Sequence, residues 1–108
     1  MIDDVAVKLA LEYLDRSFAK GEPADLAGML NHVDYYDRVV MVREEVLEVL
    51  KQRPYVYVQR VDGRVFFTQT SGDHEITEDD LNRSVQVYQD EVQAQYRQLR
   101  SRDEAEGE

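Results

Sequence analysis

The feature that most constrains the fold of this 108-residue chain is a pair of short runs joined by Asp62-Gly63. Residues 55–61 and 64–70 are rich in β-branched and aromatic side chains, which favour extended backbone. An Asp-Gly pair between two such runs is typical of a two-residue type I′ turn, because both turn positions need a positive φ. The sequence therefore predicts an antiparallel β-hairpin with strands at about 55–61 and 64–70.

A two-residue turn also fixes the register, so each residue of one strand has a defined partner. The expected cross-strand pairs are Val61 with Arg64, Val58 with Phe67, and Val56 with Gln69. Alternation along the strands then gives the hairpin two unlike faces. The face assigned to the core carries Val56, Val58, Val65 and Phe67. The opposite face carries Tyr55, Tyr57, Phe66 and Thr68 beside Arg64.

This second face is unusually aromatic for a surface in contact with water. Aromatic residues and arginine are enriched at protein interfaces, which makes Tyr55, Tyr57 and Phe66 candidate protein-binding residues. Tyr35 and Tyr36 belong to the same class. The alternative for all five is ordinary half-buried packing in a small domain.

The residues ahead of the hairpin predict three helices. In residues 4–20, apolar side chains recur every three or four positions, which is the period of an amphipathic helix. Asp3 or Asp4 can cap its first amides, and Gly21 followed by Pro23 ends it. The apolar positions are Val7, Leu11, Leu14 and Phe18.

A second helix is expected to begin at Pro23, whose missing N–H costs nothing in a first helical turn. Residues 31–32 are one candidate for its end, and residues 34–37 are either a last turn or a loop. A third helix is predicted over about 41–53, where Pro54 stops it. The buried stripe of the second helix is Leu26, Ala27, Leu30 and Val33.

A long helix is predicted at about 78–100, opened by a capping box of Thr77 and Asp80. Its apolar residues alternate at spacings of four and three, a narrow seam that resembles a short coiled coil. The seam predicts a homodimer; the alternative is that the helix wraps its own domain. Residues 101–108 are highly charged and are expected to form a disordered acidic tail. The predicted dimerisation residues are Leu81, Val85, Tyr88, Val92 and Leu99.

Composition limits the chain to one domain, placed at residues 1–100. The 23 acidic and 13 basic residues give a formal charge of −10, and there is no cysteine. Disulfides and thiolate metal sites are therefore excluded. No apolar run approaches the roughly 20 residues of a membrane span. The start of the chain is acidic, unlike a secretory signal, which predicts a cytoplasmic protein.

The negative charge is unevenly distributed. Residues 38–72 hold six basic and four acidic residues, whereas the flanking segments carry net charges of −5 and −7. A net-basic segment inside an acidic chain indicates a possible contact with nucleic acid. The alternative is a solvated surface of average composition.

Residues 56–68, which read Val56-Tyr57-Val58-Gln59-Arg60-Val61-Asp62-Gly63-Arg64-Val65-Phe66-Phe67-Thr68, resemble the wing of the small dimeric winged-helix transcriptional repressors. The order helix, short helix, helix, hairpin and long helix is also similar to that family, over about residues 5–98. The resemblance implies an α+β, winged-helix-like fold. The third helix would then enter the DNA major groove and the hairpin would touch the backbone. The positions implied to bind nucleic acid are Arg43, Lys51, Arg60 and Arg64.

Enzyme chemistry is not expected. His32 and His74 stand in no recognised ligand spacing, and Asp73-His74-Glu75 is interpreted as a solvated turn. The sequence has no glycine-rich phosphate loop and no nucleophile elbow. We therefore expect no catalytic residue, no metal and no cofactor.

Two functions follow as competing hypotheses. The first is a dimeric winged-helix regulator that touches DNA through the third helix and the wing. The second is an acidic protein-interaction module, either an adaptor or a DNA-mimicking inhibitor, that binds a protein through the aromatic hairpin face. Glu44, Glu45 and Glu48 on the third helix favour the second, because they would oppose phosphates.

Overall fold

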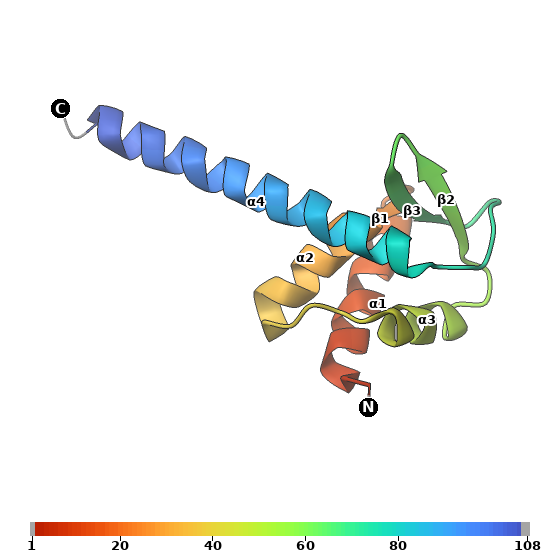
Figure 1. Ribbon diagram of the computed structural model, residues 1–108. Helices are drawn as coiled ribbons and strands as arrows, with labels where there is room; N and C mark the ends of the chain where they lie inside the picture. Colours follow the sequence, from red (N-terminus) through yellow and green to blue (C-terminus); the bar gives the residue numbers. More distant parts are fainter. Residues whose placement is uncertain (1, 107–108) are drawn as a thin grey trace.

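A computed structural model describes residues 2–106 of the chain and the side chains of residues 2–100 (Figure 1). This part of the chain forms four helices and a three-stranded antiparallel sheet, an α+β fold whose element order is compatible with a winged-helix-like arrangement. The elements are α1 (Asp4–Ala19), β1 (Ala24–Asp25), α2 (Leu26–Asp37), α3 (Arg43–Lys51), β2 (Tyr57–Val61), β3 (Arg64–Thr68) and α4 (Glu78–Glu106).

The hairpin of β2 and β3 has the predicted turn. Asp62 and Gly63 both have positive φ angles, 50° and 80°, as a type I′ turn requires. The pairs Val61 with Arg64 and Val58 with Phe67 are confirmed, whereas residues 56 and 69 lie outside the two five-residue strands. The predicted core face is also confirmed, because each of its residues is at most 6% exposed: Val56, Val58, Val65 and Phe67.

The prediction of a two-stranded sheet was wrong, because β1 adds a third strand on the other side of β3. Ala24 pairs with Phe67 and Asp25 pairs with Phe66, giving the order β1-β3-β2. The expected helix start at Pro23 is displaced to Leu26, with Asp25 accepting a hydrogen bond from the N–H of Ala27. A two-residue strand has no periodicity to detect, since its backbone is extended only because β3 lies beside it.

The helices ahead of the hairpin follow the prediction with changes at their ends. The open question about residues 34–37 is settled, because α2 continues to Asp37 and Arg38, whose φ is 57°, caps its C-terminal end. The third helix is shorter than expected, covering 43–51 instead of 41–53. Asp3 caps α1 as predicted, accepting hydrogen bonds from the N–H groups of Val5 and Ala6.

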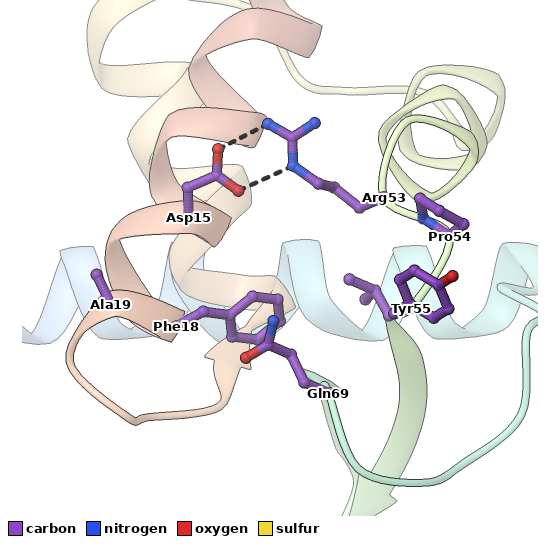
Figure 2. A pocket seen from close by; sticks show the side chains of 8 residues that line it. Asp15, Phe18, Ala19, Arg53, Pro54, Tyr55 and Gln69 are labelled. Carbon is purple, nitrogen blue, oxygen red and sulfur yellow. Dashed lines mark hydrogen bonds and ion pairs between the residues drawn. The ribbon is translucent and has the colours of Figure 1, made fainter.

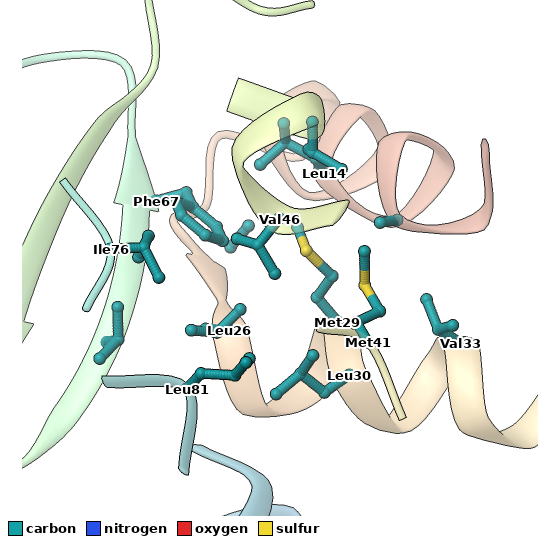
Figure 3. Close-up of a cluster of buried hydrophobic side chains, with 14 of the residues drawn as sticks. Leu14, Leu26, Met29, Leu30, Val33, Met41, Val46, Phe67, Ile76 and Leu81 are labelled. Atoms are coloured by element: carbon teal, nitrogen blue, oxygen red, sulfur yellow. The ribbon is translucent and has the colours of Figure 1, made fainter. Parts of the chain in front are cut away.

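The core is a single cluster centred on α2, which packs against α1, α4 and β3. Figure 3 shows side chains from all these elements converging, together with Val46 of α3. Two residues of the connecting segments, Met41 and Ile76, are also fully buried. The α2 side chains in the cluster are Leu26, Met29, Leu30 and Val33.

The long helix α4 starts against the body of the protein and then extends away from it (Figure 1). The described part of the chain therefore measures 55 × 30 × 27 Å. The helix continues to Glu106, past the predicted end near residue 100, and its backbone includes six residues assigned to the disordered tail. Those residues carry no apolar periodicity, but Ala, Glu and Arg are strong helix formers. Residues 107–108 of the predicted tail lie outside the described residues.

Two glycines give a matched test of how the loop after β3 is held. Gly72 has a φ of 146°, and a Cβ there would lie 2.3 Å from the carbonyl oxygen of Val58. Gly72→Ala would thus break the bridge in which Val58 and Asp73 exchange two backbone hydrogen bonds. We expect a loss of roughly 3 kcal/mol in the free energy of unfolding, measured by urea denaturation.

The control is Gly21→Ala, because Gly21 has a φ of 73° but open space around the added methyl group. It should cost only the backbone strain, about 1 kcal/mol. Equal losses in the two variants would show that the contact with Val58 does not matter.

Candidate interaction surfaces

Arg60, predicted to touch DNA, lies at the surface with its side chain 38% exposed, and carboxylates bind its guanidinium there. Its Nε and Nη2 donate to Oδ1 and Oδ2 of Asp80 at 2.8 and 2.6 Å. Its Nη1 donates to Asp73 at 2.6 Å, and Nη2 also donates to the carbonyl oxygen of Glu75 at 3.0 Å. The guanidinium therefore ties β2 to the first turn of α4 and to the loop between β3 and α4.

These contacts set the charge state of the carboxylates. The hydrogen bonds from Arg60 lower the pKa of Asp80 to about 2, and the N–H of Thr77 adds to this effect. The pKa of Asp73 is lowered mainly by the same guanidinium. Both acids therefore stay ionised around Arg60, and the positive charge of Arg60 is more than balanced locally.

Arg64, the second predicted wing contact, is also paired with two acids. Its Nη2 binds Asp25, the N-cap residue of α2, and its Nη1 donates to Glu91 of α4 at 2.7 Å. These bonds raise the pKa of Arg64, with the contact to Asp25 contributing most. Arg64 thus connects β3 to α2 and α4 instead of pointing away from the domain.

The two α3 residues predicted to bind nucleic acid, Arg43 and Lys51, lie in different surroundings. Arg43 is half-buried, and its Nε donates to the carbonyl oxygen of Ile76 at 2.5 Å. Lys51 is exposed in the last turn of α3. Of the four predicted nucleic-acid contacts, only Lys51 is without a contact in the described structure that holds it to another element. Sequence reasoning missed these pairings because the acids that bind Arg60 and Arg64 are 13 to 39 residues away in the sequence.

The three aromatic residues of the predicted protein-binding face lie in different surroundings. Tyr55 is 77% exposed and precedes β2, where it borders a cleft of about 390 Å³. Figure 2 shows Phe18 of α1 across this cleft, below the ion pair of Asp15 and Arg53. Tyr57 packs against His74 with ring centres 5.0 Å apart, and Phe66 is half-buried.

The seam of α4 divides into a buried half and an exposed half. Leu81 and Tyr88 are buried against the domain and Val85 is half-buried, so these three serve internal packing. The hydroxyl of Tyr88 donates to Asp34 of α2 at 3.0 Å. The predicted dimerisation residues that stay accessible are Val92 and Leu99, together with Tyr96, which are 42%, 60% and 67% exposed.

A groove between α2 and α4 meets this exposed half. It has a volume of about 520 Å³, and Val92 belongs both to the groove and to the exposed stripe of α4. Burial and the neighbouring Asp34 raise the pKa of Tyr88 to about 12, so its hydroxyl keeps its proton on the groove wall. The residues lining the groove are Asn31, Asp34, Tyr35, Tyr88, Gln89, Val92 and Gln93.

Among residues 2–106, no group of three acidic, histidine or cysteine side chains is placed to hold a metal ion. His32 lies between the rings of Tyr13 and Tyr36, and burial lowers its pKa. None of the helices in the described part of the chain is long and apolar enough to cross a membrane.

Comparison of the chain with protein-family models, with curated proteins and with solved structures finds no match. The functional argument therefore rests on the surfaces described above.

The pair of Arg60 and Asp80 gives a prediction for stability in acid. The lowered pKa of Asp80 stabilises the folded state above the ordinary aspartate pKa of 3.8, and this stabilisation is lost as the pH falls from about 4 to about 2. Arg60→Ala leaves Asp80, 8% exposed, without its cation; because the Arg60 side chain is 38% exposed and solvent screens the pair, the cost at pH 7 should be about 1–2 kcal/mol. Urea denaturation across this pH range measures both effects.

Arg83→Ala is the control, since Arg83 pairs with Asp79 one turn earlier on the exposed surface of α4. Its cost should stay below about 0.5 kcal/mol. An Arg60→Ala protein as stable as Arg83→Ala at pH 7 would contradict the assignment.

Proposed function

We propose that this chain is a non-enzymatic, winged-helix-like module that pairs with a second copy of itself and acts by binding protein. The observation that carries the proposal is the apolar stripe of Val92, Tyr96 and Leu99, which continues the buried seam of α4 onto its exposed half. An apolar stripe with helical spacing on a protruding helix is a surface that another helix covers.

Each copy offers two complementary parts of such an interface. The stripe on α4 supplies apolar side chains, and the groove between α2 and α4 supplies a concave surface with Tyr35 on its wall. A two-fold pairing brings both parts together twice, because every contact of one copy is repeated by the other. The repetition doubles the buried surface area, and a specific interface buries about 1,200–2,000 Å² in total.

The positions of Arg60 and Arg64 favour protein over DNA as the further partner. Each is bound to two acids, so neither offers an unbalanced charge to a phosphate. The carboxylate of Glu45 lies at the start of α3, where a helix would otherwise attract an anion. Tyr55, exposed beside the cleft of Phe18, is our candidate contact for a protein partner.

DNA contact is the second candidate function, and the element order supports it. Ahead of α4 the chain has three helices, a short strand and a hairpin, with the strand order β1-β3-β2. In a winged-helix domain with this order, α3 would be the recognition helix. Lys51 is exposed on that helix. A DNA-mimicking inhibitor, consistent with the charge of −10, is a variant of the protein-binding function.

The α4 stripe gives a direct test of self-association. Tyr96→Glu introduces a charge into the proposed interface, and sedimentation equilibrium should show a dimer for the natural chain and a monomer for the variant. Because Tyr96 is 67% exposed, the free energy of unfolding of the monomer should be little affected.

Ala94→Glu is the matched control, since residue 94 is also exposed but lies on the opposite side of α4 from the stripe. It should remain dimeric. A monomeric natural chain at high micromolar concentration, or equal dissociation in both variants, would reject the α4 interface.

Lys51→Ala separates the two partner classes. If DNA is bound, fluorescence anisotropy at low salt should show an affinity that falls steeply with salt and weakens in this variant. We expect no such dependence and no effect of Lys51→Ala. Lys51→Ala is preferable to Arg60→Ala or Arg64→Ala, because the two arginines also stabilise the fold. Salt-dependent binding lost in Lys51→Ala would establish the DNA function instead.

A further inference from the structure

The protruding part of α4 begins where α2 ends beside it. Leu81, Ser84 and Tyr88 are buried, whereas every side chain from residue 89 to residue 100 is exposed. Beyond Gln93, which still lines the groove with α2, the helix extends past α2 and the sheet (Figure 1). Residues 94–100, the bare segment, make roughly two helical turns. This segment can enter a groove on another molecule without bringing its own domain into contact.

The groove between α2 and α4 lies directly before the bare segment. Its apolar side comes from Val92 and the ring of Tyr35, which are 42% and 76% exposed. Its polar side includes Asp34, whose Oδ2 accepts the hydroxyl hydrogen of Tyr88 at 3.0 Å. A carboxylate has further lone pairs on both oxygens, so Asp34 can accept from a second donor. The groove therefore fits a helix surface that combines apolar side chains with a cation.

The bare segment carries this combination. Tyr96 and Leu99 continue the apolar stripe and are 67% and 60% exposed. Arg100 lies about 80° around the helix from Val92, on the same flank as Gln93, because each residue of an α-helix turns by about 100°. The bare segment contains two arginines and no acid. Its charge is thus opposite to that of the groove.

We infer that a second copy binds antiparallel, with the bare segment of each α4 lying in the α2–α4 groove of the other. The inference rests on the self-association proposed above and adds its orientation and its charge contact. Placing Arg100 of one copy opposite Gln89 of the other brings it beside Asp34, since Gln89 and Asp34 line the same groove. The two-fold axis then passes between residues 94 and 95. The same register fills both grooves, as a two-fold axis requires.

A parallel pair would not fill the grooves. The α4 residues at one level would face the same residues of the second copy, so each bare segment would lie against the other bare segment. Helix handedness would also turn the groove flank of one copy toward the opposite flank of the other. On that flank Glu91 binds Arg64 of the hairpin, so the hairpin of one copy would meet the groove of the other. Antiparallel pairing instead brings the two groove flanks together.

The orientation is tested by the distance between two spin labels. The chain has no cysteine, so Glu78→Cys, exposed at the start of α4, accepts a single nitroxide per copy. In the antiparallel register the two labels lie about 33 residue rises apart, which is about 50 Å. Parallel helices would hold them within about 20 Å, because the axes of packed helices are about 8–10 Å apart. Pulsed electron–electron double resonance measures this separation.

Charge exchange tests the contact itself. Arg100→Glu sets a glutamate beside Asp34 of the second copy, and Gln89→Arg sets an arginine beside Arg100. Each change should raise the dimer dissociation constant at least about tenfold in sedimentation equilibrium, and the variant with both changes should recover the natural constant within about threefold. Residues 89 and 100 lie about 17 Å apart within one helix, so this recovery requires two copies.

Arg97→Glu is the control, since it makes the same charge change about 140° around the helix from Val92, farther from the groove. It should shift the dissociation constant less than about threefold.

The measurements distinguish this orientation from self-association itself. A natural chain that remains monomeric rejects self-association and this orientation together. A dimer whose labels lie within about 20 Å, or whose double variant stays as weak as Arg100→Glu, overturns the antiparallel arrangement and leaves self-association standing.

Discussion

The ion pair between Arg60 and Asp80 is the contact on which the arrangement of this protein most depends. It is the point where the hairpin, the loop after it and the long C-terminal helix are joined, with the guanidinium bound to two carboxylates and a carbonyl oxygen. Asp80 also completes the capping box with Thr77, so the same carboxylate starts α4 and anchors it. This anchor fixes the first turn of α4, and the hydrogen bond of Tyr88 to Asp34 and the ion pair of Arg64 with Glu91 hold the helix further along.

Acidic side chains hold the helix starts and the hairpin together, which changes the meaning of the net charge of −10. Asp25 caps α2 and binds Arg64, Glu45 joins α1 to α3, and Asp3 caps α1. These acids are structural partners as well as a solvating surface. Three of the six basic residues in the middle of the sequence, Arg53, Arg60 and Arg64, are ion-paired with acids, so the local excess of +2 does not become a positive surface on the hairpin.

The predictable parts of the fold were those encoded by neighbouring residues. The Asp62-Gly63 turn, the register of Val58 against Phe67 and the buried face of the hairpin follow from local backbone preference and alternation. The helix over residues 4–19 follows from its apolar spacing and from the cap at Asp3. By contrast, β1 was missed, because Ala24 and Asp25 are extended only through pairing with β3.

The sequence by itself therefore determined the four helices and the hairpin, their order, and an α4 seam with a period close to that of a coiled coil. Only the tertiary structure decided which half of that seam is already used, since Leu81 and Tyr88 are covered by the domain while Tyr96 and Leu99 are exposed. It also decided which charges are available, because Arg60 and Arg64 meet acids far away in the sequence. The physical reason is the same in both cases: spacing along a chain fixes hydrogen bonding and periodicity within one element, whereas burial and ion pairing depend on which other element lies opposite.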